Sequence, residues 1–163
     1  MAKLPTGADS YEDVPLSALV RAARRTYGQA VRRAQEEIGC DDLPRAGGFI
    51  LTTMSWSDAS VEAVVRWMGV SKQAVSQVLD RLVVRGYLER KQDLRDRRRV
   101  RLVLTERGRA AAAAARGAIE RVDRQLLTRV GRARVNQTRE TLVALIELGR
   151  TRGRRAADVE GGS

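Results

Sequence analysis

The sequence predicts a mainly α-helical fold that carries one small β-hairpin. Apolar residues recur every three or four positions over most of the chain, which indicates amphipathic helices. Around Gly69 two short helical patterns are separated by a three-residue turn, and two alternating runs follow Gly86 with an arginine-rich connection between them. This order is that of a winged helix-turn-helix, flanked here by additional helices at both ends.

Length and composition suit one folded unit with a polyanionic partner. The chain has 163 residues, of which 43% are hydrophobic and 31% charged, and one compact domain is the expectation. Its net charge of +11 favours nucleic acid, because clustered cations release condensed counterions when they bind it. Nearly all of this charge is arginine, which a GC-rich coding sequence also produces. The positions of the arginines therefore carry more information than their number.

The sequence lacks the residues that are characteristic of several other classes of function. The chain has one cysteine and no histidine, so we expect no disulfide within the chain, no metal and no cofactor. No nucleophile and base pair or Gly-rich phosphate loop is recognisable, so we expect no enzyme. No apolar run approaches the roughly 20 residues that span a bilayer, and no signal peptide opens the chain. The expected location is the cytoplasm, in association with the nucleoid.

The first third of the chain predicts an arm and two helices. Residues 1–12 are polar and read as a flexible arm. A helix is expected over about 15–38, ending near Gly39, and a second over Arg45–Trp56. The apolar positions of the first helix recur at helical spacing: Leu16, Leu19, Val20, Ala23, Tyr27, Ala30, Val31 and Ala34.

The next segment predicts a helix-turn-helix. Ser60 is placed to cap a short helix that runs to Met68, and after the turn Ser71 caps another. The second helix has one apolar face, formed by Ala74, Val75, Val78, Leu79, Leu82 and Val83. Its exposed start carries polar side chains that suit entry into a DNA major groove: Ser71, Lys72, Gln73, Ser76 and Gln77.

A hairpin and two further helices complete the prediction. Strands are expected over Tyr87–Gln92 and Arg99–Leu104, and the connection between them is an arginine-rich tip suited to phosphates or a minor groove. Thr105 is placed to cap a long helix that reaches Val130. A last helix is expected over about Arg134–Arg150, and residues 151–163 read as a disordered tail.

These residues resemble the multiple antibiotic resistance regulator (MarR) family of bacterial transcription factors. The hairpin carries the strongest likeness, since Asp96-Arg97-Arg98 is similar to the family's D-x-R wing and Leu104-Thr105, with Gly108, to its L-T-x-x-G exit. Val75-Ser76-Gln77 and the segment 85–90 look like the family's recognition helix and first wing strand. The motifs extend over residues 60–108, and the order of helices extends the resemblance to about residue 150.

The resemblance implies a function and a set of DNA contacts. It implies a homodimer whose recognition helices enter successive major grooves, about 34 to 36 Å apart on a pseudo-palindromic site. Such a protein acts as a repressor, and many relatives respond to a small-molecule effector, for which no residues are assigned here. By motif position Arg98 enters the minor groove and Asp96 orients it, while Arg95 and Arg97 are expected at phosphates.

The resemblance also implies a division of the chain. It predicts a single MarR-like domain over 13–150. Within that domain a DNA-binding winged helix is expected at about 43–108, with dimerisation helices at about 15–38 and 109–150.

Two alternatives remain open at this point. The same fold could serve a basic architectural or RNA-associated protein without a specific operator. Duplex DNA is preferred, because readers of RNA sequence usually offer aromatic stacking platforms and aromatic residues form only 4% of this chain. Cys40 could sense oxidants, but an inert thiol is expected because the charges of Asp41 and Asp42 disfavour a thiolate.

Overall fold

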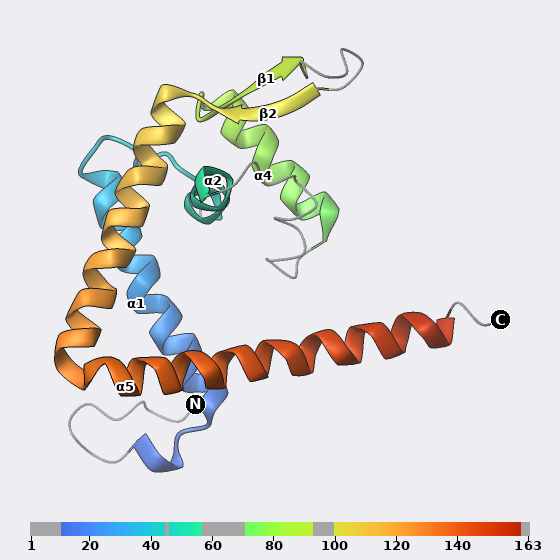
Figure 1. Ribbon diagram of the computed structural model, residues 1–163. Coiled ribbons are helices and arrows are strands. Elements are labelled where there is room, and N and C mark those ends of the chain that lie inside the picture. The colour runs from blue at the N-terminus through green and yellow to red at the C-terminus, as the bar shows by residue number, and fades with distance from the viewer. Residues whose placement is uncertain (1–10, 45, 57–70, 93–99, 161–163) are drawn as a thin grey trace. The chain divides into compact units, whose positions relative to one another are not determined.

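The computed structural model describes residues 11–44, 46–56, 71–92 and 100–160 (Figure 1). The predicted helix from Ser60 to Met68 and the predicted wing tip, with Arg95, Asp96, Arg97 and Arg98, lie outside these ranges. The chain divides into two compact units, residues 1–120 and residues 121–163. Among the described residues, every buried side chain belongs to the first unit. The single domain over 13–150 stays a prediction.

Within its described residues, the first unit contains the predicted helices and strands in the predicted order. A short 3-10 turn, Tyr11–Asp13, precedes the helices. The helices and strands are α1 (Leu16–Glu36), α2 (Gly47–Trp56), α4 (Lys72–Val84), β1 (Leu88–Gln92), β2 (Val100–Leu104) and the start of α5 (Glu106–Glu160). Their bounds agree with the predicted helices and strands to within two residues. The described part of the chain is therefore mainly helical with one two-stranded hairpin, as the sequence predicted.

Helices α1 and α4 end in the same way. Gly39 and Gly86 follow them with φ angles of 73° and 72°, the left-handed conformation that glycine adopts without strain. After α1 the Cys40 amide donates to Gln35 O at 2.9 Å, and after α4 the Tyr87 amide donates to Leu82 O at 2.9 Å. These are the closing hydrogen bonds of Schellman motifs. Both helices therefore stop abruptly and leave carbonyl groups free to accept other donors.

The hairpin is antiparallel and half buried. Leu88 pairs with Leu104, Arg90 with Leu102 and Lys91 with Arg101. Successive side chains of a strand point to opposite faces, so Leu88, Leu102 and Leu104 share the face that packs on the core. The other face carries charge and is open to solvent.

The core of the first unit joins α2, α4, the hairpin and the start of α5. Val75, Leu79 and Leu82 are the buried side chains of α4. Ala74, which the sequence placed on the same face, is exposed, because it lies about 100° around the helix from Val75. The buried members of the core cluster are Cys40, Ile50, Leu51, Val75, Leu79, Leu82, Tyr87, Leu88, Ala111 and Ala112.

The start of α5 fits closely against the end of α4. Thr105 Oγ1 accepts a hydrogen bond from the Gly108 amide at 3.0 Å and so caps α5, as predicted. The same hydroxyl donates to Gly86 O, at 2.7 Å. A Cβ atom added at Gly108 would lie 2.0 Å from the carbonyl oxygen of Tyr87. Only glycine allows the backbones to approach this closely.

The second unit is formed by the rest of α5. Gly131 interrupts the helix with φ 80° and ψ 162°, and helical geometry resumes directly after it. The last helix thus starts before the predicted Arg134, and it continues to Glu160 instead of ending at Arg150 in a disordered tail. Extension of an existing helix costs little for a segment rich in alanine and arginine.

The last helix exposes a set of large apolar side chains. Leu142, Val143, Leu145 and Ile146 are between 38% and 50% exposed and lie within about 160° of one another around the helix. We call these four residues the apolar face of α5. A helix with such a face is stable in water when a partner covers it.

Candidate nucleic-acid interface

The five residues predicted to read DNA lie on α4 and its cap, and all of them are exposed. Val75 and Leu82 fix the rotation of the helix, because both are buried in the core. Gln73 and Gln77 are one turn apart and lie on the opposite side of the helix from these anchors. The structure therefore presents a row of polar side chains on the solvent side of α4. The complete predicted set is Ser71, Lys72, Gln73, Ser76 and Gln77.

Ser71 has a structural role in addition to its exposure. Its Oγ accepts a hydrogen bond from the Ala74 amide at 3.2 Å, which caps α4 as the sequence predicted. The positive end of the helix dipole and the first free amides lie at this cap. An anion such as a phosphate is favoured at such a helix start.

An ion pair joins α4 to the hairpin. Arg90 of β1 donates from Nη2 to Asp80 Oδ1 at 2.6 Å, with both side chains more than half exposed. Its contribution to stability is small, because solvent screens an exposed pair. Its position matters more, since it places a positive charge beside the polar row of α4.

The solvent face of the hairpin carries two cations in direct opposition. Lys91 pairs with Arg101 across the strands, and both are exposed. Like charges at such a pair repel each other. Lys91 Nζ contacts Glu89 Oε1 at 2.8 Å, which offsets one of the two charges. A phosphate group bound near Arg101 would offset the other positive charge.

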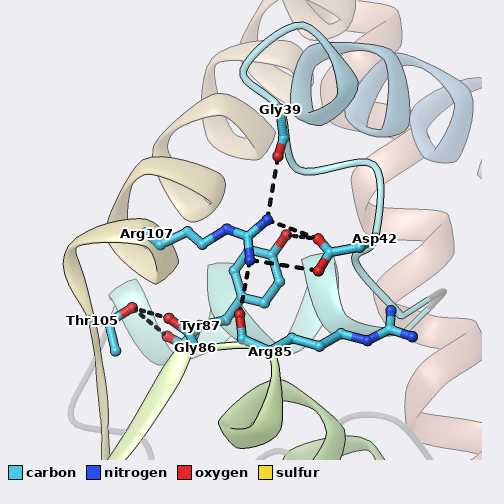
Figure 2. A network of polar contacts seen from close by, with 7 residues as sticks. All are labelled: Gly39, Asp42, Arg85, Gly86, Tyr87, Thr105 and Arg107. Carbon is cyan, nitrogen blue, oxygen red and sulfur yellow. Dashed lines mark hydrogen bonds and ion pairs between the residues drawn. The ribbon is translucent and has the colours of Figure 1, made fainter.

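A polar cluster connects the ends of α1 and α4 to the start of α5 (Figure 2). The Arg107 guanidinium donates to Asp42 Oδ1 at 3.0 Å, and its Cζ lies 4.3 Å from the centre of the Tyr87 ring. The Tyr87 hydroxyl also donates to Asp42 Oδ1. Arg107 donates further to Arg85 O at 2.9 Å and to Gly39 O at 3.3 Å. We call Asp42, Tyr87 and Arg107 the clamp.

The contacts within the clamp shift the pKa values of Asp42 and Tyr87 in opposite directions. The hydrogen bond from Tyr87 is the largest cause that lowers the pKa of Asp42 below its ordinary 3.8, and the charges of Arg107 and Arg85 act in the same direction against the effect of burial. Burial raises the pKa of Tyr87 above its ordinary 10.0, and the hydrogen bond to Asp42 adds to this. Both shifts favour the pairing of a carboxylate with a neutral phenol.

Acid should weaken the first unit through Asp42. Because its pKa is lower in the folded chain than in the unfolded chain, its contribution to stability is present above pH 3.8 and is lost as pH falls through the folded value. We expect Asp42→Asn to flatten the fall of the unfolding free energy below pH 4. Urea unfolding between about pH 2 and pH 7 measures this. Equal slopes for Asp42→Asn and wild type below pH 4 would contradict the assignment.

Neither the clamp nor the Asp80–Arg90 pair follows from the local pattern of the sequence. One signal for the clamp was present, since Arg107 follows Thr105 and Glu106 in the first turn of a helix, where a positive charge is unfavourable. Such a residue needs a specific partner. That partner, Asp42, is 65 positions away in the chain, and the helical and strand patterns do not connect them.

The fold is that of a winged helix-turn-helix with helical extensions. Residues 50–99 match the model of the MarR family. This match, together with the fold, confirms the family resemblance: the segment 50–99 is a MarR-family segment within a MarR-type fold. None of the curated protein sequences matches the chain.

Solved structures of MarR-type regulators share the fold. The MarR regulator from Oenococcus oeni PSU-1 is 16% identical, with 82% of this chain and 99% of that chain covered and a TM-score of 0.64. The S. aureus MepR–DNA complex is 16% identical, covers 83% and 97%, and has a TM-score of 0.67. Reduced MarR from E. coli is 23% identical, covers 83% and 98%, and has a TM-score of 0.59. At these identities the likeness establishes the fold.

Two other kinds of site were sought among the described residues. Within those ranges no cluster of three or more potential metal ligands occurs. None of the helices in the described part of the chain is both long enough and apolar enough to cross a membrane. Cys40 is buried in the core of the first unit.

Proposed function

We propose that this chain is a sequence-specific regulator that binds double-stranded DNA through α4 and the hairpin. The observation that carries the proposal is the polar row of α4, which is rotated away from the core by buried Val75 and Leu82. Gln73 and Gln77 have side chains that can bond bidentately to adenine. Ser71 and Lys72 lie at the helix start, where phosphates are favoured. The S. aureus MepR structure is a DNA complex with the same fold, which supports DNA as the partner.

The hairpin supplies the second part of the proposed interface. Arg101 and Lys91 present positive charge on its solvent face, next to the position where the tip begins. In our proposal Arg98 enters the minor groove and Asp96 orients it, while Arg95 and Arg97 contact phosphates. The solvent-facing cations of the strands continue this contact along the DNA backbone.

The proposed regulator is a homodimer. The apolar face of α5 is uncovered in a single chain, and Leu16 at the start of α1 is also 54% exposed. A second copy is the partner we assign to these faces, because two-fold homodimers are the commonest assemblies and a two-fold axis matches a palindromic site. The proposed action is repression, by occupation of a promoter site. A small-molecule effector stays a prediction, and no residue is assigned to it.

The wing assignment is tested by Arg98→Ala. We expect operator affinity to fall about tenfold or more, the cost of about 1 to 3 kcal/mol that follows loss of a specific DNA contact, with the dimer unchanged. Fluorescence anisotropy with a labelled duplex measures the affinity, and sedimentation measures the dimer.

A matched variant separates the contact from the loss of charge. Arg139→Ala removes one exposed positive charge from the last helix, in the second unit, and leaves the predicted DNA-binding residues unchanged. It should weaken binding by less than about threefold, because long-range attraction is screened at physiological salt. Wild-type affinity for Arg98→Ala, or equal losses for the two variants, would remove Arg98 from the interface.

A further inference from the structure

One side chain, Arg107, bonds to the ends of two helices at once. Its Nη1 donates to Arg85 O, at the end of α4, and its Nη2 donates to Gly39 O, at the end of α1 (Figure 2). The C-terminal end of a helix carries partial negative charge on its free carbonyl groups. A single guanidinium therefore neutralises and ties together two helix ends that are far apart in the sequence.

Asp42 and Tyr87 hold this guanidinium in place. Asp42 accepts from both terminal nitrogens of Arg107, at 3.0 Å and 3.5 Å. The Tyr87 ring lies against the guanidinium, and its hydroxyl is bonded to the same carboxylate. Tyr87 is itself completely buried. The orientation of Arg107 is thus fixed by a rigid part of the core, although the side chain is 40% exposed.

Thr105 and Arg107 together leave α4 little freedom to shift. Thr105 Oγ1 donates to Gly86 O, and the Thr105 amide donates to Tyr87 O at 3.1 Å. The carbonyls of residues 85, 86 and 87 are therefore all bonded to Thr105 or Arg107, at the cap and in the first turn of α5. Arg107 extends this connection to Gly39, just after α1, and Gln35 Nε2 of α1 donates to Ala111 O of α5 at 3.3 Å.

We infer that Arg107 is a positioning residue that sets α4 relative to α1 and thereby sets the spacing between the two recognition helices of the dimer. The inference rests on the proposed function, in which α1 contributes to the dimer and α4 reads DNA. In such a dimer each recognition helix is placed by its connections to the dimerisation helices. When the connection through Arg107 is lost, each α4 keeps its contacts with its half-site. The dimer then binds sites over a wider range of distances between the half-sites.

The test compares half-site spacings. A palindromic duplex is first selected from random-sequence DNA with the wild-type chain, and a second duplex carries one additional base pair between the half-sites. The insertion separates the half-sites by about 3.4 Å and rotates one by about 35°. We expect wild type to bind the longer site at least about tenfold more weakly, and Arg107→Gln to reduce this ratio to less than about threefold. Affinity for a single half-site should be the same for both proteins.

The matched control is Arg109→Gln. Arg109 lies on the same turn, and its side chain donates to Leu104 O at 2.9 Å, where that of Arg107 donates to the segments that follow α1 and α4. This variant loses the same charge, and its ratio of affinities for the shorter and longer duplexes should equal that of wild type. A role for Arg107 in stability alone would lower the unfolding free energy and leave the ratio unchanged, because affinities are measured on folded protein.

Tyr87→Phe provides a second, milder change in the clamp for the same test. Tyr87→Phe removes only the hydroxyl that holds Asp42, and it should give a spacing ratio between those of wild type and Arg107→Gln. If Arg107→Gln does not fold, Tyr87→Phe carries the comparison. If Arg107→Gln and Tyr87→Phe fold and have the wild-type ratio of affinities for the two duplexes, the inference is wrong. If wild type selects no site at all, the proposed function fails instead.

Discussion

Gly108→Ala should destabilise the first unit by about 3 kcal/mol, the upper range for forcing extra volume into a packed site. The added Cβ would lie 2.0 Å from the carbonyl oxygen of Tyr87, and neither backbone can move without cost. Relief requires α5 to retreat from the end of α4, which breaks the Thr105 contacts with Gly86 and Tyr87. Urea unfolding followed by circular dichroism measures the loss.

Gly28→Ala is the matched control. Gly28 lies inside α1 with no atom within 4 Å of an added Cβ. Alanine at an unstrained helical position should stabilise the chain by about 0.5 to 1 kcal/mol. The two glycine substitutions are therefore expected to have opposite signs. Wild-type stability for Gly108→Ala would show that the close approach of α5 to Tyr87 is absent in solution.

Ile146→Glu should dissociate the proposed dimer. Ile146 is 50% exposed in the single chain and lies within the apolar face of α5. In a two-fold dimer each substitution occurs twice, so two buried apolar side chains are lost and two carboxylates face an apolar contact. We expect the dimer dissociation constant to rise at least about a hundredfold, which corresponds to about 3 kcal/mol. Sedimentation velocity over a concentration series measures it.

Gln137, nine positions before Ile146 in the same helix, is the site of the matched control substitution. It lies on the opposite side of the last helix, about 180° from Ile146, and it is exposed. Gln137→Glu introduces the same charge and should leave the dimer intact. If Ile146→Glu remains a dimer with wild-type affinity, the apolar face of α5 is not the contact between copies.

The local pattern of the sequence predicted most of the first unit. Helical spacing of apolar residues identified α1 and α4, and strict alternation identified β2. Ser71 and Thr105 were correctly predicted as helix caps, because capping depends on residues three positions apart. These features are local, and a single sequence contains them directly.

The remaining features depend on contacts between distant segments. The side chains of the clamp come from three separate segments of the chain, and Arg107 meets Asp42 only because the start of α5 packs against the segments that follow α1 and α4. The extent of the last helix was also missed, since the sequence beyond Arg150 lacks the apolar spacing by which helices were identified. Periodicity detects helices that pack, and it does not detect a helix that extends from an existing one.

DNA binding as a function of salt tests the central claim most directly. The duplex is the palindromic site selected by wild type, and the comparison is a scrambled duplex of equal length and composition. Affinity for both should fall as salt rises, because bound phosphates release counterions. Our account predicts that a preference of at least about a thousandfold for the selected site persists at physiological salt. Equal affinities for the two duplexes at every salt concentration would contradict sequence-specific regulation by this chain.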